Sequence, residues 1–380
     1  MHIFFIDQYI GLDVLSPIAF SLRKTEKVLI YNLNPFQNLK PNKLLKFLKK
    51  NNIDYFEVLN SLKGVSIFLI KFYLKFPKCI ICLKFFNIIY KLLDKYYFAI
   101  NEKELKNLFI NNKIKSVTLE ESLSNRKLTI ISKVCKNLNI PLILVASGIN
   151  AIKLPKLYKK DLSLVNYYLS PNSLRKYSKN LHKKKTVKIL GSARYSDEWI
   201  HVLDKIYHKN ISRNKNKINI GFFLRPGSHE NKKVISLIEE IKKIKGVKCE
   251  IRDKPRDLRP NICSQFYYNN MNSSELIRWS DLIITARASS ILLEALKKNK
   301  IIIIPTYLNP LVKYTPIVKY KGILKYNKKA LLLKFINNFL INKFNKNLTK
   351  YNKNKFEKKF VGNFYKEKVL DNYNNFYKKL

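Results

Sequence analysis

The residues best suited to chemistry in this chain lie in the stretch "SDLIITARASSILLEALKKNKIIIIPTYLNP", residues 280–310. An apolar run ends at Thr285, and Ser289 and Ser290 follow after a three-residue turn. This pattern predicts a strand, a turn and a helix that Ser289 caps. The first turn of a helix offers backbone N–H groups that attract phosphate. We therefore expect a phosphate site at this turn.

Two charged residues accompany the serines. Arg287 adds a cation in the turn, and Glu294 lies one helical turn beyond Ser290. The inward face of the helix is expected to consist of Ile291, Leu292, Ala295 and Leu296. Glu294 would then point to the solvent side, where its carboxylate could accept hydrogen bonds from the two hydroxyls of a ribose. The alternative is an ordinary capped helix with a solvated glutamate.

Three more cations follow strand-like runs in the second half of the chain. Arg225 ends "GFFLR", and Lys254 and Arg256 lie in the charged loop "RDKPRD". Cations at the carboxyl ends of strands suit a pyrophosphate, which accepts charge-assisted hydrogen bonds. For Lys254 and Arg256 the alternative is a solvated loop.

Carboxylates that could act as a general base lie in the first half. Asp13 follows the first apolar run in "IGLDVLSP", and Glu120 and Glu121 follow "SVTL". A carboxylate at such a position can remove a proton from a hydroxyl nucleophile. The alternatives are a helix cap for Asp13 and a surface position for Glu120. The histidines have no metal-ligand spacing, so we expect no metal site; they are His2, His182, His201, His208 and His229.

Apolar runs and helical periods alternate along the chain. The expected strands are residues 2–7, 27–32, 115–121, 140–148, 281–285 and 300–306, and two more strands are expected within 217–228 and 246–257, where each runs into a loop. The expected helices are residues 16–24, 124–139, 229–245, 273–280, 289–298, 327–341 and 354–380. In the first of these helices, Ser16 is the expected cap and Pro17 the first residue. Near-continuous apolar strands that alternate with helices predict parallel, doubly wound α/β sheets.

The length of 380 residues predicts two domains. The polar, basic segment "SKNLHKKKT" marks a linker between two β/α halves. We expect a first domain at 1–182, a linker region at 183–215, a second domain at 216–345 and a terminal helical segment at 346–380.

The formal net charge of +48 could indicate a nucleic-acid-binding protein. Lysine is, however, spread over the whole chain and accompanied by abundant Asn, Ile and Tyr, as an AT-rich genome favours. Neither a basic stripe with interleaved aromatics nor a known nucleic-acid-binding module is visible. We therefore expect distributed charge and no specific nucleic-acid partner.

The expected compartment is a reducing cytoplasm. The five cysteines are scattered, and Cys79 and Cys82 have no second pair, which favours buried thiols over disulfides or zinc. Asp7, Gln8 and Asp13 interrupt the N-terminal apolar run, unlike a signal peptide.

Residues 65–100 form the most apolar region of the chain, but they contain six lysines and Pro77. The lysines argue against a membrane-spanning helix. A pair of core helices is one interpretation, and a basic amphipathic helix on an anionic membrane surface is the other.

The order "NSSELIRWSDLIITARASSILLEALKKNKIIIIPTYLNP" resembles the C-terminal half-site of GT-B glycosyltransferases, particularly those that make surface polysaccharides. The related glycerophosphotransferases that use CDP-glycerol look similar here. "ILGSARYSDEW" resembles the segment before the second GT-B domain, and "FVGNFYKEKVLDNYNNFY" resembles the final helix, which crosses back onto the first domain. The resemblance covers roughly residues 186–380.

This resemblance implies two Rossmann-like domains that face a cleft. Ser289 and Ser290 would bind the nucleotide's phosphates and Glu294 its ribose, with neither a metal nor a cofactor besides the nucleotide-sugar donor. The chain departs from many relatives at Ala288, where they have Gly, and at Asp253–Arg256, where they have a Lys-Pro-His-type motif.

The implied activity is sugar transfer from a nucleotide-sugar donor to a surface-polysaccharide or lipid-linked acceptor. The enzyme alternatives are a glycerophosphotransferase and a nucleotide-sugar 2-epimerase of the same fold. A sugar-binding relative without activity is a further alternative.

Overall fold

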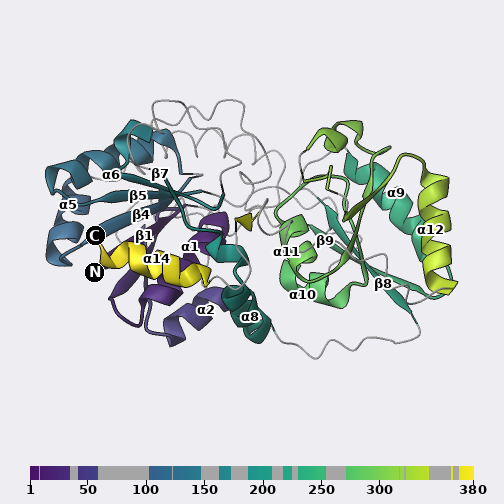
Figure 1. Cartoon of the computed structure of the whole chain (residues 1–380), viewed down its shortest axis with the longest axis horizontal. Coiled ribbons are helices and arrows are strands. Elements are labelled where there is room, and N and C mark those ends of the chain that lie inside the picture. The colour runs from purple at the N-terminus through teal and green to yellow at the C-terminus, as the bar shows by residue number, and fades with distance from the viewer. Residues whose placement is uncertain are drawn as a thin grey trace, which may run out of the picture. The chain divides into compact units, whose positions relative to one another are not determined.

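The computed structural model describes residues 1–7, 9–34, 42–58, 102–121, 123–146, 162–172, 187–207, 217–224, 230–253, 271–315, 317–320, 322–341, 361–362 and 368–380. The chain divides into two compact units (Figure 1). Unit 1 comprises Met1–Val202 and Glu357–Leu380, and unit 2 comprises Leu203–Phe356. The division at Leu203 falls within the expected linker region at 183–215.

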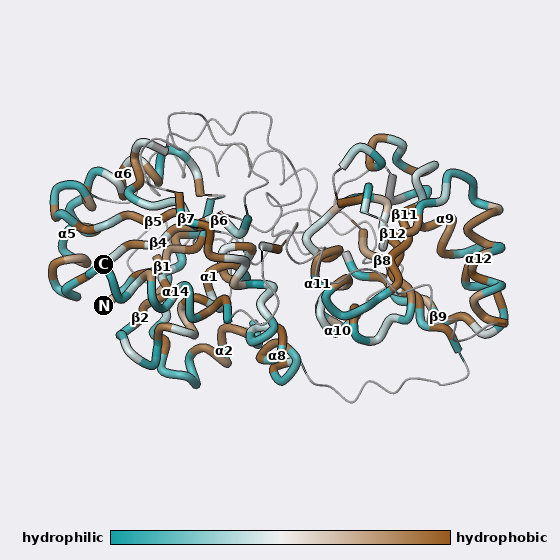
Figure 2. Tube along the Cα trace, viewed as in Figure 1, coloured by the Kyte–Doolittle hydropathy of each residue, from teal (hydrophilic) through white to brown (hydrophobic). Residues whose placement is uncertain are grey.

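Unit 1 contains a parallel sheet with the strand order β3-β2-β1-β4-β5-β6-β7. Its strands are β1 (His2–Ile6), β2 (Val28–Asn32), β3 (Asp54–Glu57), β4 (Ser116–Glu120), β5 (Leu142–Val145), β6 (Tyr167–Ser170) and β7 (Val187–Ile189). All residues of β1, β4 and β5 are buried. Burial on both faces explains why these strands read as continuous apolar runs, and Figure 2 shows their hydrophobic character.

The described helices of unit 1 that precede β5 connect successive parallel strands. They are α1 (Tyr9–Leu22), α2 (Lys43–Lys50), α5 (Glu102–Asn111), α6 (Asn125–Asn137), α8 (Asp197–Ile206, which continues into unit 2) and α14 (Val369–Lys378). Short 3₁₀ turns are η2 (Leu162–Leu164) and η3 (Ala193–Tyr195). Ser124 caps α6 through a bond from the Lys127 amide to its hydroxyl.

The expected start of the first helix at Ser16 is wrong. Helix α1 begins at Tyr9 and contains Pro17 in its interior. The Ser16 hydroxyl donates to the carbonyl of Leu12 at 2.5 Å instead of capping the helix. Burial of Leu15, Pro17 and Ile18 in the core keeps the helix intact despite the missing proline N–H.

The C-terminal helix α14 belongs to unit 1, where it contacts α1. The buried Tyr377 hydroxyl lies 2.7 Å from the Thr118 hydroxyl in β4. Tyr373, also buried, donates to the Gly191 carbonyl at 2.9 Å. The end of the chain therefore stabilises both the sheet and the segment just before η3.

Unit 2 contains a parallel sheet with the order β12-β11-β10-β8-β9. Its strands are β8 (Ile218–Leu224), β9 (Val247–Asp253), β10 (Leu282–Ile284), β11 (Ile301–Pro305) and β12 (Ile323–Tyr326). Its helices are α9 (Glu230–Lys242), α10 (Ser273–Trp279), α11 (Ile291–Lys297) and α12 (Lys329–Ile341), with a 3₁₀ turn, η4 (Pro310–Tyr314). Strands β8, β10 and β11 are fully buried.

The helices of unit 2 cover opposite faces of its sheet. One core cluster combines α9 and α12 with alternate residues of β8, such as Ile220 and Phe222. Gly221 faces the other way, and a Cβ added there would lie 2.2 Å from Ser280 Oγ and 3.3 Å from Leu276 in α10. Helix α11 packs beside α10. The alternation of strand side chains thus separates an α9–α12 face from an α10–α11 face.

Candidate active site

The strand order of unit 2 identifies where a ligand would bind. Strand β8 pairs with β9 on one side and with β10 on the other, so the order reverses between β8 and β10. In open α/β sheets, ligands bind beyond the carboxyl ends of the strands at such a switch point. Arg225 directly follows β8, and the turn from Thr285 to Ser290 follows β10. The turn that carries Ser289 and Ser290 therefore follows one of the two strands that flank the switch point, and Arg225 follows the other in the sequence.

The turn after β10 is fastened by Thr285. Its hydroxyl donates to the Arg287 carbonyl at 3.1 Å and accepts from the Arg287 amide at 3.4 Å. Helix α11 begins at Ile291, with Ser290 as its N-cap residue. Ser290 has helical dihedral angles and makes no side-chain capping bond. The Ser289 carbonyl accepts from the Leu292 amide at 3.1 Å, and the side-chain cap at Ser289 stays a prediction. Both serines nevertheless lie at the start of α11.

Glu294 is buried rather than solvent-facing, which corrects the sequence-based expectation. Its side chain belongs to a residue that is 5% exposed, and its Oε1 accepts a bond from the Ser274 hydroxyl at 2.5 Å. Leu292, Leu293 and Leu296 are all 0% exposed. The short helix is therefore buried around Glu294 and does not present this residue to solvent. The contact between α10 and α11, which a single helix pattern does not reveal, covers this carboxylate.

The N-terminus of α10 is tightly organised beside Glu294. Asn272 and Glu275 form a complete capping box. Arg252, near the end of β9, donates from Nε to the Ser273 hydroxyl at 3.1 Å. Ser274 is the next residue and bonds Glu294. Sequence reasoning missed Arg252, although its position near a strand end, two residues before Lys254, was a usable signal.

Arg225, Lys254 and Arg256 lie outside the described residues. Their roles at the donor phosphates remain predictions. Arg287 lies within the described part of the chain and is half-buried in the turn after β10.

The sheet of unit 1 reverses its order between β1 and β4. Glu120 is the last residue of β4, and Glu121 follows it; both are buried, at 3% and 2% exposed. Tyr168 in β6 donates to Glu121 at 3.2 Å. Asp7, which follows β1, forms a buried ion pair with Lys127 of α6 at 2.6 Å. This pair was missed, because the residues are far apart in the sequence.

Asp13 lies inside helix α1, not in a loop after the first strand. Its carboxylate pairs with Arg194 of η3 at 3.1 Å, and its side chain is 45% exposed. Arg194 is 15% exposed. Asp13 is therefore both oriented by a cation and accessible to a ligand, unlike Glu120.

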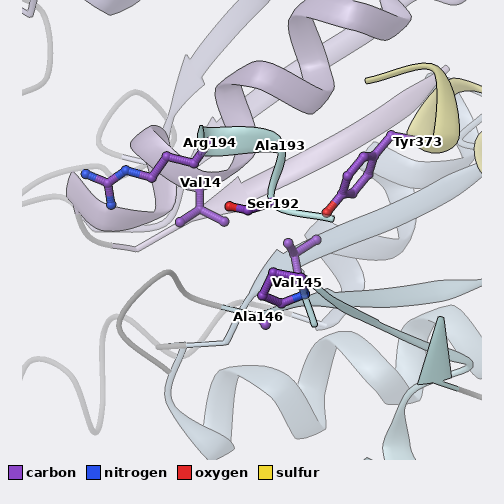
Figure 3. A pocket seen from close by; sticks show the side chains of 8 residues that line it. Val14, Val145, Ala146, Ser192, Ala193, Arg194 and Tyr373 are labelled. Atoms are coloured by element: carbon purple, nitrogen blue, oxygen red, sulfur yellow. The ribbon is translucent and has the colours of Figure 1, made fainter. Parts of the chain in front are cut away.

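A small pocket adjoins this ion pair (Figure 3). Its lining consists of Val14, Val145, Ala146, Pro171, Ser192, Ala193, Arg194 and Tyr373. In Figure 3 the Tyr373 hydroxyl points toward the chain at Ser192, and Arg194 extends away along η3. Val145 and Ala146 place the pocket at the carboxyl end of β5. The bond from Tyr373 to the Gly191 carbonyl helps to hold the segment that carries Arg194.

No group of three His, Cys, Asp or Glu side chains in the described part of the chain could hold a metal ion. Burial raises the pKa of the Cys135 and Cys249 thiols to about 12, so neither is a reactive thiolate at neutral pH. Cys79, Cys82 and Cys263 lie outside the described residues. The expectation of a metal-independent site remains a prediction.

Within the described residues, no helix is both long enough and apolar enough to cross a bilayer. The apolar, lysine-rich segment at 65–100 lies outside them. Both interpretations of that segment therefore remain predictions.

Solved structures show which fold this is. A putative UDP-N-acetylglucosamine 2-epimerase from Listeria monocytogenes matches with a TM-score of 0.57 and 10% identity, over 99% of this chain and 94% of that chain. CalG4, the calicheamicin glycosyltransferase, matches with a TM-score of 0.53 and 8% identity, over 95% and 94% of the two chains. The S. aureus MnaA–UDP structure matches with a TM-score of 0.51 and 11% identity, over 92% and 89%.

No protein-family model matches the chain, and no curated protein matches it significantly. At identities of 8–11% the structural similarity establishes the fold alone. The chain has the two doubly wound α/β units of the GT-B fold, as the sequence predicted.

Proposed function

We propose that this protein is a glycosyltransferase that moves a sugar from a nucleotide-sugar donor to a surface-polysaccharide or lipid-linked acceptor. One observation carries the proposal: β8, which precedes Arg225 in the sequence, and β10, which precedes the Ser289–Ser290 turn, are the adjacent strands at the switch point of unit 2. A Ser-Ser turn placed at random in the sheet would not be expected at the switch point in particular. Structures of the same fold include a glycosyltransferase and a protein solved with UDP.

In this proposal unit 2 binds the nucleoside diphosphate. The backbone around Ser289 and Ser290 and the Arg287 guanidinium bind the diphosphate, together with Arg225, Lys254 and Arg256. Glu294 accepts hydrogen bonds from the ribose. A carboxylate has about four acceptor sites, so the bond from Ser274 does not by itself prevent this role. As the sugar leaves, cations and N–H dipoles stabilise the charge that develops on the diphosphate.

Unit 1 would supply the acceptor site and the base. Asp13 is the better candidate base, because its carboxylate is accessible and Glu120 is buried. In an inverting transfer, Asp13 removes the proton of the acceptor hydroxyl as that oxygen attacks the anomeric carbon. Arg194 holds the carboxylate in place as a positioning residue.

The fold does not identify the acceptor or the location of the protein, so both are proposed from the charge and composition of the chain. We propose a cytoplasmic enzyme that associates with the inner face of the membrane, where lipid-linked acceptors are exposed. The net charge of +48 favours anionic surfaces of this kind. Residues 65–100 are the proposed contact.

A second candidate, a nucleotide-sugar 2-epimerase, is favoured by a different observation. Glu120 and Glu121 are adjacent carboxylates at the switch point of unit 1. Epimerisation needs an acid and a base on opposite sides of a sugar carbon, and carboxylates can serve as both. One of the similar structures is a putative UDP-N-acetylglucosamine 2-epimerase. The relation to CDP-glycerol glycerophosphotransferases remains a prediction.

A donor screen followed by a product assay tests the proposal. Thermal unfolding of the full chain is measured with UDP, GDP, CDP, ADP and dTDP, and then with their sugars. Saturation to a hundredfold excess over Kd should raise Tm by roughly 5–10 °C. The matching nucleotide sugar should then release nucleoside diphosphate only when a glycan acceptor is present. Isomerised sugar without an acceptor would select the epimerase, and no stabilisation by any nucleotide would contradict both candidates.

A further inference from the structure

A groove in unit 2 lies between helix α9 and the residues that follow β11. It encloses about 500 Å³, within the usual range for a small-molecule site. The lining residues are Lys232, Lys233, Ser236, Leu237, Glu240, Tyr307, Leu308 and Lys329. Helices α9 and α12 lie side by side here and share one core (Figure 1). The groove is thus on the α9–α12 face, opposite the face that carries Glu294.

The Tyr307 hydroxyl is the unusual feature of this groove. Its oxygen is buried and has no hydrogen-bond partner within the described part of the chain. Burial, with a smaller contribution from Glu240, raises the pKa of Tyr307 to about 12. The phenol is therefore protonated at neutral pH and can donate. A buried donor without an acceptor destabilises the fold, and a ligand oxygen in the groove would satisfy it.

The polar lining carries excess positive charge. Lys232, Lys233 and Lys329 supply three cations, and Glu240 supplies one carboxylate, which pairs with Lys329 at 2.8 Å. Lys232 and Lys233 lie in the first turn of α9, where the helix dipole is also positive. Ammonium groups and a phenol donor together suit a compact anion with several acceptor oxygens, such as a phosphate group.

The remaining lining is apolar. Leu237 is 2% exposed and Leu308 is 8% exposed, so both are embedded in the wall rather than projecting into solvent. The ring of Tyr307 continues this wall. A ligand that fills the groove would therefore combine a phosphate head with an apolar body.

We propose that this groove binds a phosphate monoester attached to an apolar group. Lys232 and Lys233 contact the phosphate oxygens, Tyr307 donates to one of them, and Leu237 and Leu308 contact the apolar part. Such a group occurs both on membrane lipids and on soluble phosphate esters. The groove lies on the α9–α12 face of the sheet, whereas Glu294 lies on the α10–α11 face.

Octyl phosphate is the probe that tests the site, titrated calorimetrically into the full chain with inorganic phosphate as the comparison. Octyl phosphate should bind more tightly, because inorganic phosphate cannot use the apolar wall. Lys233→Gln should weaken its binding by about tenfold or more, and Tyr307→Phe by about threefold. Tyr307→Phe removes only the buried hydroxyl, so Tm should stay the same or rise.

Lys243→Gln is the matched control, because Lys243 follows α9 closely, is exposed and does not line the groove. It makes the same change in net charge and should alter binding by less than about twofold. No binding of octyl phosphate, or equal effects of Lys233→Gln and Lys243→Gln, would overturn the proposal, because attraction to the chain's overall charge would then explain everything.

Vesicles distinguish the two sources of the ligand. Co-sedimentation is measured with phosphatidylcholine vesicles that contain or lack phosphatidic acid. If Lys233→Gln releases the protein from phosphatidic acid vesicles and Lys243→Gln does not, the groove binds a lipid headgroup. If octyl phosphate binds through Lys233 but both vesicle types behave alike, the ligand is a soluble phosphate ester.

Discussion

Replacing Glu294 by Gln separates a donor-binding role from a purely structural one, because the change preserves shape and removes only the charge. Glu294 is 5% exposed and accepts a bond from Ser274 at 2.5 Å. Hydrogen bonds to charged groups contribute about 1.5–3 kcal/mol, and neutral ones about 0.5–1.5 kcal/mol. Weakening the Ser274 bond in this way should lower the free energy of unfolding by about 1 kcal/mol and Tm by roughly 2–4 °C.

The effect on the donor should be larger than the effect on stability. If Glu294 accepts ribose hydroxyls, Glu294→Gln loses a charge-assisted acceptor, and Kd for the matching nucleoside diphosphate should rise roughly tenfold or more. The assay is calorimetric titration of that nucleotide into both proteins, with thermal unfolding of each measured in parallel.

Ser274→Ala provides the control. It removes the hydroxyl that bonds Glu294 but leaves the carboxylate charged, so it should lower stability while changing nucleotide affinity by less than about threefold. A nucleotide that binds wild type and Glu294→Gln equally, with only Tm reduced, would refute the ribose role. Glu294 would then be a structural link between α10 and α11.

Three further changes test other parts of the structure. Asp13→Asn should lower kcat of the acceptor-dependent reaction by about 100-fold or more with donor Kd unchanged, because it removes a base that acts only in transfer; an unchanged kcat would move the base elsewhere. Burial lowers the pKa of His2 to about 4, although Glu26 opposes this shift. As the pH falls from about 6.5 to 4, His2 is therefore protonated in the unfolded chain but not in the folded protein. Stability should therefore fall over that window by up to about 3 kcal/mol, and urea midpoints of His2→Gln should show a flatter pH dependence. Tyr377→Phe should cost about 1–2 kcal/mol in urea unfolding, because it leaves the buried Thr118 hydroxyl without its 2.7 Å partner; no loss would mean that packing alone holds α14.

Eight strands and their parallel arrangement were predictable from runs of apolar residues, whereas β3, β6, β7 and β12 were missed. Runs such as "HIFFI" and "IIIIP" are buried on both faces, and few structures besides the centre of a parallel sheet bury five consecutive apolar residues. The capping box of α10 was equally local, because Asn272 and Glu275 bond each other's backbone within one turn. Elements stabilised by neighbouring residues are those that a sequence pattern can predict.

Helix α1 and Glu294 show where local patterns fail. Ser16 and Pro17 have the types of a helix start, but packing against the core carries α1 through them. Glu294 has the type of a solvent-facing residue, but α10 covers it. In both places contacts from elsewhere in the fold outweigh a preference of about 1–3 kcal/mol.

The sequence by itself determined which residues follow which strand ends, and so which chemistry each edge of a sheet could carry. Only the tertiary structure decided which strand ends are neighbours and which distant side chains come into contact. The reversal in unit 2 makes neighbours of β8 and of β10, which precedes the Ser289–Ser290 turn, and packing of α1 against η3 pairs Asp13 with Arg194, 181 residues away. The physical reason is that hydrogen-bonded turns and caps are set by adjacent residues, whereas strand order and the burial of a charge depend on the whole packed core.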